Sequence, residues 1–329
     1  MQESLLKVRN LRTTFQIGEK KLCAVDGINL NIKYAGTNAI VGESGCGKSV
    51  TLLSILRLIQ TPPGRIDAKQ ILFEGRNLLR LSEKEMREIR GNEIAMIFQE
   101  PMSSLNPVFK VGDQIIEAIT LHQDVNRREA MDRAIEMLRL VRIPDPEKRL
   151  QDYPHQMSGG MRQRVMIAMA LSCHPKLLLA DEPTTALDVS IQAQILELIR
   201  QLKHDLGMAI LLVTHDLAVV AELAQRTVVM YSGKIMEEAD VFSIFSSPLH
   251  PYTEGLLKSM PRLDEEVKQL HVIEGFVPDA ISFPEGCRFH PRCTYATDEC
   301  KEIEPILRQI APGHLVACHI AEKRVRDAD

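Results

Sequence analysis

GESGCGKS at residues 42–49 decides how the rest of this chain is interpreted, because it has the form G-x-x-x-x-G-K-S of a phosphate-binding loop. The apolar run 38–41 before it predicts a buried strand, and leucines and isoleucines at helical spacing follow it over 50–59. Glycines let successive backbone N–H groups point inward at an anion, and the start of a helix adds its positive end. A chance glycine-rich turn before a helix would rarely combine all these features.

The loop predicts a bound nucleotide with its metal ion. Lys48 is placed to reach the β- and γ-phosphates, and the Ser49 hydroxyl is placed to be a ligand of Mg²⁺. The residues expected to surround the phosphates are Ser44, Gly45, Cys46, Gly47, Lys48, Ser49 and Val50.

Composition limits the class of protein. The chain has 329 residues, of which 45% are hydrophobic and 26% charged, as in globular proteins of two or three domains. The net charge of -4 gives no reason to expect a nucleic-acid partner. Because no apolar run approaches the ~20 residues that span a bilayer, and no signal-peptide pattern starts the chain, any work at a membrane is expected from the aqueous side.

Polar residues follow three apolar runs that predict buried strands. Gln99 ends the run 94–98, Asp181 and Glu182 end the run 177–180, and His215 follows the run 209–213. The carboxyl ends of parallel strands are where ligands bind in α/β sheets, so Asp181 is expected to hold Mg²⁺ and Glu182 to face a water beside the γ-phosphate. Two acids after a strand can also cap a helix, and a histidine there is often only a satisfied core group.

Two weaker signals complete the candidate site. Ser158, Gly159 and Gly160 open a predicted helix and could form a second anion site, although such caps are common. Phe15 ends a strand-like run upstream of the phosphate loop, where an aromatic ring could stack on a nucleotide base or simply belong to the core.

The order of these patterns predicts an α/β fold. Alternation of apolar and polar residues over about 5–33 predicts an antiparallel β subdomain, and the apolar runs predict a mixed sheet core. Helical periodicity with many charges indicates a helical insertion over about 100–155. We expect an ATPase domain over residues 1–260 and a small cysteine-rich C-terminal domain over 261–329.

Four of the seven cysteines lie in that tail, with the spacing C-x5-C-x6-C-x17-C: Cys287, Cys293, Cys300 and Cys318. Four thiolates suit Zn²⁺ or an iron–sulfur cluster. The C-x2-C hooks of most zinc sites are missing, and the longer spacings favour a [4Fe–4S] cluster over one ion. Zn²⁺ and free thiols or disulfides remain alternatives.

Five elements in fixed order resemble the ATP-binding subunit of ABC transporters over roughly residues 5–260. They are the phosphate loop, Gln99, Ser158-Gly159-Gly160, Asp181-Glu182 and His215. The resemblance implies ATP as substrate, with Mg²⁺ held by Ser49, Gln99 and Asp181 and with Glu182 as general base. It also implies that His215 stabilises the γ-phosphate and that Phe15 takes the place of the aromatic ring that stacks on adenine.

Two further stretches resemble the dipeptide/oligopeptide (and nickel) import branch. They are MIFQEPMSSLNP at 96–107, and HPYT at 250–253 together with GCRFHPRC at 286–293. The branch implies peptide import and points to the [4Fe–4S] cluster. One departure is Met161, which stands where many relatives have Gln and removes a polar contact from the signature MSGGM at 157–161.

The resemblance also implies partners. They are a second ATP-binding subunit, homologous but not identical, and two integral-membrane permease subunits, with an extracytoplasmic peptide-binding protein acting indirectly. The chain is then expected at the cytoplasmic face of the cell membrane. A soluble ABC-type ATPase of DNA repair or translation and a redox-responsive regulatory ATPase that uses the tail cluster are the alternatives. Repair members need long coiled coils and translation members usually carry two ATPase units, and neither pattern occurs in the sequence.

Overall fold

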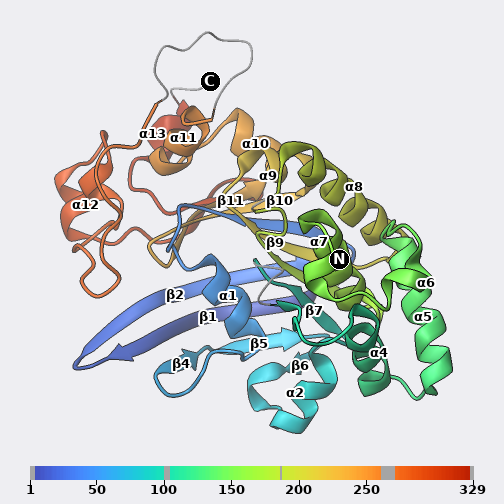
Figure 1. Ribbon diagram of the computed structural model, residues 1–329. Coiled ribbons are helices and arrows are strands. Elements are labelled where there is room, and N and C mark those ends of the chain that lie inside the picture. Colours follow the sequence, from blue (N-terminus) through green and yellow to red (C-terminus); the bar gives the residue numbers. More distant parts are fainter. Residues whose placement is uncertain (1–3, 100–103, 186, 261–270, 327–329) are drawn as a thin grey trace. The chain divides into compact units, whose positions relative to one another are not determined.

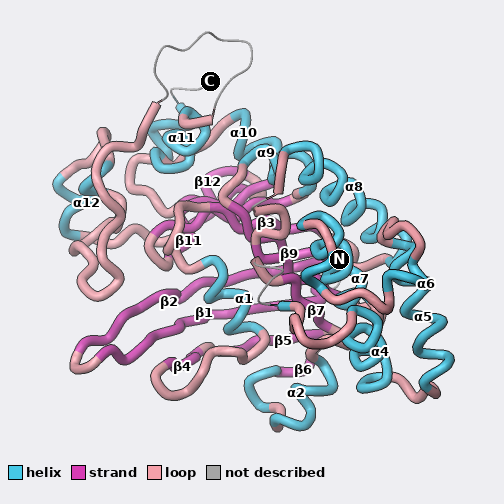
Figure 2. The backbone as a smooth tube through the Cα atoms, viewed as in Figure 1, coloured by secondary structure: helices cyan, strands magenta, loops and turns pink. Residues whose placement is uncertain are grey.

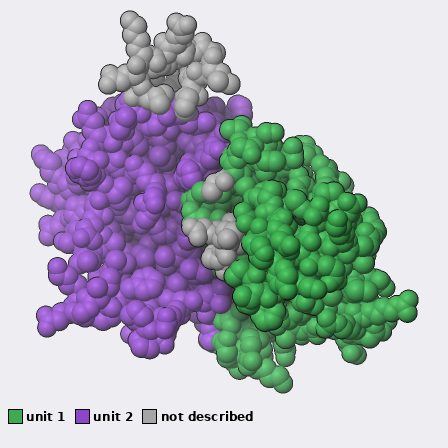
Figure 3. All heavy atoms as spheres, viewed as in Figure 1, with its two compact units in different colours: residues 1–3, 33–36, 80–212 green, residues 4–32, 37–79, 213–329 purple. Residues whose placement is uncertain are grey.

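The computed structural model describes residues 4–99, 104–185, 187–260 and 271–326 (Figure 1). The described chain divides into two units, coloured separately in Figure 3. The first unit comprises residues 33–36 and 80–212, and the second comprises 4–32, 37–79 and the chain from 213 onward. Parts of two sequence predictions lie outside the described residues: the start of the helical insertion at 100–103 and the domain boundary at 261–270.

An antiparallel sheet forms the N-terminal part of the second unit, as the alternating pattern predicts. β1 (Ser4–Ile17) pairs with β5 (Gln70–Phe73) and β4 (Gly64–Asp67), and β5 also pairs with β6 (Arg76–Asn77). β2 (Lys20–Lys33) lies on the other side of β1, which gives the order β2-β1-β5-β6. Leu6 and Val8 of β1 are fully buried, whereas the intervening Lys7 is not, so one face of the strand belongs to the core.

A mixed sheet carries the phosphate loop. β3 (Thr37–Val41) is buried at every residue and runs parallel to β10 (Arg226–Tyr231), which pairs antiparallel with β11 (Lys234–Asp240). A strand buried throughout is typical of a sheet covered on both faces. The loop leaves the end of β3 and leads into helix α1 (Lys48–Ile55). The mixed sheet expected from the sequence is therefore confirmed.

The C-terminal segment extends this sheet, which the sequence did not predict. β13 (His314–Val316) pairs with β11, and β12 (Arg308–Ala311) pairs with β13. Irregular turns were expected here because strands of three or four residues are too short for a readable alternation. A small cluster anchors the segment: Leu249, Val316, Cys318 and Ala321. Besides α1, the described helices of the second unit are α9 (Leu217–Leu223), α10 (Val241–Ser246), α11 (Pro251–Lys258), α12 (Asp298–Glu302) and α13 (Ala321–Arg326), with the 3-10 turn η3 (His290–Arg292). The 3-10 turn η1 (Leu78–Arg80) lies where the chain passes from the second unit to the first.

In the first unit, helices gather around a parallel strand pair, β7 (Ile94–Ile97) and β8 (Leu177–Asp181). Helix α7 (Gly159–Leu171) packs against β7 and against α4 (Val111–His122), α5 (Arg127–Leu140) and α8 (Val189–Leu206). The remaining elements are α2 (Glu83–Ile89), α6 (Pro146–Arg149) and the 3-10 turn η2 (Pro154–Gln156). Helices α4 to α6 fall within the predicted insertion, and Figure 2 draws them as cyan helices.

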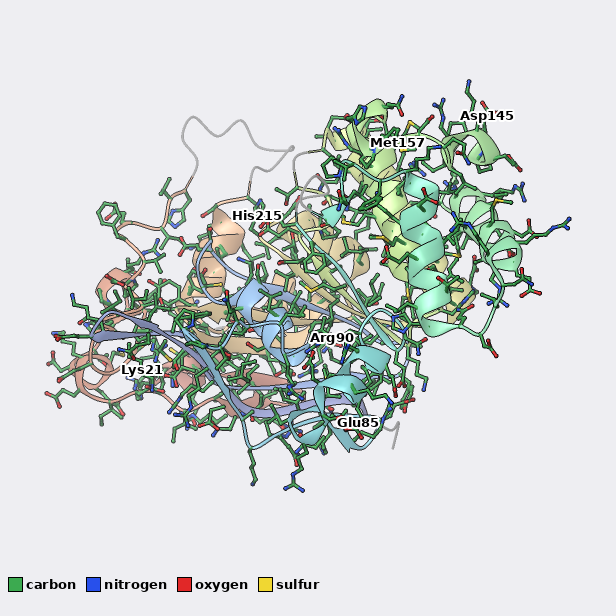
Figure 4. The ribbon with its side chains drawn as sticks, turned by 60° about the horizontal axis from the view of Figure 1, so that its bottom comes forward. Lys21, Glu85, Arg90, Asp145, Met157 and His215 are labelled. Atoms are coloured by element: carbon green, nitrogen blue, oxygen red, sulfur yellow. The ribbon has the colours of Figure 1, made fainter. Side chains whose placement is uncertain are left out.

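β9 (Ala209–Thr214) spans the boundary between the two units. Asp216 caps α9 directly after it, and His215, which Figure 4 labels, follows β9 in the sequence. Among the described residues, no helix combines the length and apolar character needed to cross a membrane.

Candidate functional site

The phosphate loop is held against the mixed sheet by backbone contacts in the second unit. Gly233 N–H donates to Cys46 O at 3.0 Å, so the turn between β10 and β11 fixes the middle of the loop. A Cβ on Gly42 would lie 2.1 Å from Met230 O, which leaves room only for glycine. The close approach to β10 therefore sets where the loop leaves β3.

Lys48 lies inside the loop rather than in solvent. Its side chain is buried, and Nζ donates to the carbonyl oxygens of Gly42 at 2.8 Å and Glu43 at 3.0 Å. Cys46 and Gly47 are buried as well, whereas Ser44 and Gly45 are exposed at the tip. An ammonium group within a curl of backbone N–H groups suits polyphosphate.

Gln99 and Glu182 meet in the first unit, although they are distant in sequence. Gln99 Nε2 donates to Glu182 Oε2 at 3.1 Å, and Thr185 Oγ1 donates to the same oxygen at 2.9 Å. Two donors to the same oxygen fix the orientation of the carboxylate. A general base needs this orientation, because it must reach the proton that it removes.

The backbone of Glu182 is strained. Its φ of 45° lies in the left-handed region that few residues other than glycine adopt. Gln163 of α7, whose side chain is buried, supports the next peptide: its Nε2 donates to Pro183 O at 2.5 Å. The signature helix and the acidic segment are thereby linked within one unit.

Ser158 is the N-cap of α7. Its Oγ accepts a hydrogen bond from Met161 N–H at 3.3 Å. A hydroxyl that accepts one hydrogen bond still has its own proton to donate, and Ser158 is exposed at the start of a helix. The arrangement can bind an anion from outside the chain. Met161 contributes its backbone to the cap.

The other predicted site residues occupy the following places. Phe15 lies near the end of β1, half-buried, opposite Gly64 of β4, and Asp181 is the buried last residue of β8. His215 is exposed. Lys48, Ser49, Phe15 and His215 belong to the second unit, whereas Gln99, Asp181, Glu182 and the Ser158 turn belong to the first.

Within the second unit, residues of the C-terminal segment contact the phosphate loop. The sequence analysis did not predict this contact. Arg292 forms an ion pair with Glu43, with Nη1 2.7 Å from Oε2, and the Tyr252 hydroxyl accepts from Glu43 N–H at 2.9 Å. Both residues stand in the stretches that resemble the peptide-import branch. No local pattern connects them to residue 43, since Tyr252 lies 209 positions away and Arg292 249.

The four tail cysteines line one cavity. The described cysteines form no disulfide, and the cavity wall includes His250, Phe289 and Tyr295 beside the thiols. Burial first, and then the neighbouring thiols, raise the pKa of Cys287 to about 11 and that of Cys318 to about 12. Neutral thiols are therefore favoured unless a cationic group occupies the cavity.

The expectation of a metal site in the tail, whether a [4Fe–4S] cluster or Zn²⁺, is not supported by the structure. Among the described residues, no three His, Cys, Asp or Glu side chains are placed to hold a single metal ion. The thiols of Cys287, Cys293, Cys300 and Cys318 line a common cavity, but the described residues do not place them as ligands of one ion. Neither the [4Fe–4S] cluster nor the Zn²⁺ alternative is thus supported by the geometry of the described residues.

Comparison with known proteins indicates the same family as the order of motifs. Residues 25–185 match the family model described as ABC transporter, and residues 236–300 match the oligopeptide/dipeptide transporter C-terminal region. A probable peptide ABC transporter ATP-binding protein of Sinorhizobium fredii is 55% identical over 95% of this chain and 94% of its own length. The dipeptide transport ATP-binding protein DppD of Escherichia coli is 51% identical over 96% of both chains.

Solved structures agree on the fold. The ATP-binding cassette MJ0796, in a dimeric post-hydrolysis state bound to ADP and Pi, superposes with a TM-score of 0.64 at 29% identity, covering 72% of this chain and 98% of its own. These matches favour the transporter interpretation over the soluble and redox-regulatory alternatives. The chain therefore belongs to the ATP-binding subunits of ABC transporters, and it is an ATPase that carries the C-terminal region of the oligopeptide/dipeptide branch.

Proposed function

We propose that this chain hydrolyses ATP to drive import of dipeptides or oligopeptides through a membrane ABC transporter. The observation that carries the proposal is the joining, in one chain, of the ABC ATPase motifs to the oligopeptide/dipeptide C-terminal region. Relatives that are 51% and 55% identical in sequence over nearly the full chain are named for peptide transport. Because cargo selection lies largely in other subunits, the proposal names peptides as a class.

Each site residue takes a role consistent with its chemistry. Lys48 and the loop N–H groups bind the β- and γ-phosphates, and Phe15 stacks on the adenine. Ser49, Gln99 and Asp181 are the residues that would hold Mg²⁺, which supplies positive charge to the phosphates when bound. Glu182 orients the attacking water and accepts its proton, and His215 donates to a γ-phosphate oxygen.

The proposed assembly pairs two ATP-binding subunits. Ser158 and its two glycines would close over the ATP of a homologous, non-identical partner, as the free hydroxyl proton of Ser158 allows. The dimeric state of MJ0796 supports such pairing. Two integral-membrane permease subunits would receive the motion, with an extracytoplasmic peptide-binding protein delivering cargo. The chain would then work at the cytoplasmic face of the membrane.

Replacing Gly159 by Asp tests the role of the signature. The nearest atom to a Cβ at this position is Leu187 Cδ2 at 3.8 Å, so the chain has room for the side chain and should fold normally. A carboxylate facing the partner's γ-phosphate repels it by ~4 kcal/mol at an effective dielectric constant near 20. Steady-state ATPase activity of the assembled transporter should fall at least about 100-fold, while ATP binding by the isolated subunit stays unchanged.

Gly159→Ala is the matched control, because it adds a Cβ without charge and should retain most of the ATPase activity. An assembled transporter that carries Gly159→Asp and hydrolyses ATP at the normal rate would show that this turn does not face nucleotide.

For the tail, we propose a C-terminal domain over residues 261–329 that holds a [4Fe–4S] cluster through Cys287, Cys293, Cys300 and Cys318. The common cavity that the four thiols line supports this proposal. The long spacings and the resemblance to the peptide-import branch point the same way. The cluster would supply the positive charge that lets the buried thiols ionise.

Iron and sulfide analysis of the anaerobically purified chain tests this proposal. We expect about four irons and four sulfides per chain, with the broad visible absorption of iron–sulfur proteins. Cys300→Ser should remove most of the iron, whereas Cys173→Ser, which changes a buried cysteine outside the cavity, should not. Zinc without sulfide, or thiols free of metal, would contradict the cluster.

A further inference from the structure

The phosphate loop contains an acid at its first variable position. Glu43 follows Gly42 directly, and its carbonyl oxygen accepts a hydrogen bond from Lys48 Nζ. A carboxylate so close to bound triphosphate repels it and weakens binding unless a cation neutralises the charge. The molecule must therefore compensate for Glu43.

Arg292 provides the compensation through a two-point contact. Its Nη1 lies 2.7 Å from Glu43 Oε2 and its Nη2 lies 3.1 Å from Oε1, which is the fork geometry of the strongest arginine–carboxylate pairs. The Arg292 side chain is 4% exposed and that of Glu43 is 27% exposed, so solvent screens the pair only partly. Burial opposes the charge of Arg292, yet the hydrogen bonds to Glu43 and Tyr231 raise its pKa above the ordinary value.

The guanidinium group is itself fixed by the C-terminal segment. Arg292 Nε donates to Glu274 O at 2.9 Å, and Nη2 also donates to Ile273 O at 3.0 Å. Nη1 lies 3.4 Å from the Tyr231 hydroxyl. With its donors satisfied by backbone, phenol and carboxylate, Arg292 has a defined position from which to hold the loop.

Tyr252 holds the same residue at its backbone. Its hydroxyl accepts from Glu43 N–H at 2.9 Å, and its own N–H donates to His250 Nδ1 at 3.0 Å. The ring is fully buried, with its centroid 4.7 Å from that of Tyr231 and 5.3 Å from that of Phe289. Glu43 is thereby bonded at its amide, its carbonyl and its carboxylate, and two of these three contacts come from beyond residue 250.

We propose that Arg292 is a positioning residue of the nucleotide site, which neutralises and orients Glu43 so that the C-terminal segment sets the affinity of the phosphate loop for ATP. The inference rests on the proposed function, in which this loop binds ATP. Arg292 stands directly before Cys293, so the segment that contacts the phosphate loop also lines the cysteine cavity.

Binding of MgATP to the purified full-length chain tests the inference, followed with a fluorescent ATP analogue. Arg292→Gln should raise the dissociation constant about tenfold, because Glu43 keeps its charge and loses its partner. The KM for ATP of the assembled transporter should rise by a similar factor, while kcat changes less than about twofold. Glu43→Gln combined with Arg292→Gln should bring the dissociation constant back to within about threefold of wild type.

The controls separate this role from a general loss of structure. Arg226→Gln removes another partly buried arginine–glutamate pair of the same unit, that with Glu238, and should leave ATP binding unchanged. If Arg292→Gln does not fold, Arg292→Lys keeps the charge without the fork and should weaken binding about threefold.

Three outcomes are decisive. Wild-type affinity in Arg292→Gln, or in a folded Arg292→Lys when Arg292→Gln does not fold, overturns the inference. Equal weakening in Arg292→Gln and in the double variant also overturns it, because Arg292 would then not act through Glu43. Failure of the wild-type chain to bind MgATP would instead count against the proposed function itself.

Discussion

Replacing Glu182 by Gln is expected to leave ATP binding within about threefold of wild type and to lower the turnover of ATP by about 100-fold or more. The amide has nearly the shape of the carboxylate but cannot accept the proton of the attacking water. Removal of a general base costs this much because proton transfer in the transition state contributes factors of 10² to 10⁴. Phosphate release by the assembled transporter and nucleotide binding by the isolated chain are the measurements.

The contacts of Glu182 make this substitution informative. Gln99 and Thr185 both donate to Oε2, so protein groups alone orient the carboxylate. Glu197→Gln is a suitable control, because it removes an exposed acid of the same unit that pairs with Arg200. Its turnover should stay at the wild-type level. Near-normal hydrolysis by Glu182→Gln would mean that another group acts as the base.

The local patterns predicted much of the fold. Alternation identified β1 and β2, because a strand buried on one face alternates apolar and polar residues. Continuous apolar runs identified strands such as β3 and β8, because a strand buried on both faces is apolar throughout. The predicted helix start at Ser158-Gly159 matches the start of α7 within one residue, since capping chemistry is local.

What the sequence could not predict depends on pairing between distant segments. β12 and β13 join the mixed sheet through a partner about 80 residues earlier, and their short length carries no period. The hydrogen bond between Gln99 and Glu182 and the ion pair between Arg292 and Glu43 likewise connect residues with no common motif. The positive φ of Glu182 is equally invisible, because it is imposed by the surrounding structure.

Replacing Gly47 by Ala is expected to weaken nucleotide binding by a factor similar to that by which Glu182→Gln lowers turnover. Gly47 caps α1 with φ of 102°, and a Cβ there would lie 2.3 Å from Ala24 O, a backbone atom that cannot move alone. The strained φ costs about 1 kcal/mol and the overlap about 1–3 kcal/mol, so the loop must shift. The N–H groups that face the phosphates shift with it, and the dissociation constant for MgATP should rise at least about 100-fold.

Gly75→Ala separates strain from overlap. Gly75 has φ of 78°, but no atom lies within 4 Å of an added Cβ. Gly75→Ala therefore introduces only backbone strain of about 1 kcal/mol and should bind ATP normally. Unfolding temperature and ATP affinity of both variants are the measurements. If Gly47→Ala lowered neither property more than Gly75→Ala, the contact between the loop and Ala24 would not hold the loop in its binding shape. The loop curvature would then have to come from its remaining contacts, among them those of Glu43 with Arg292 and Tyr252.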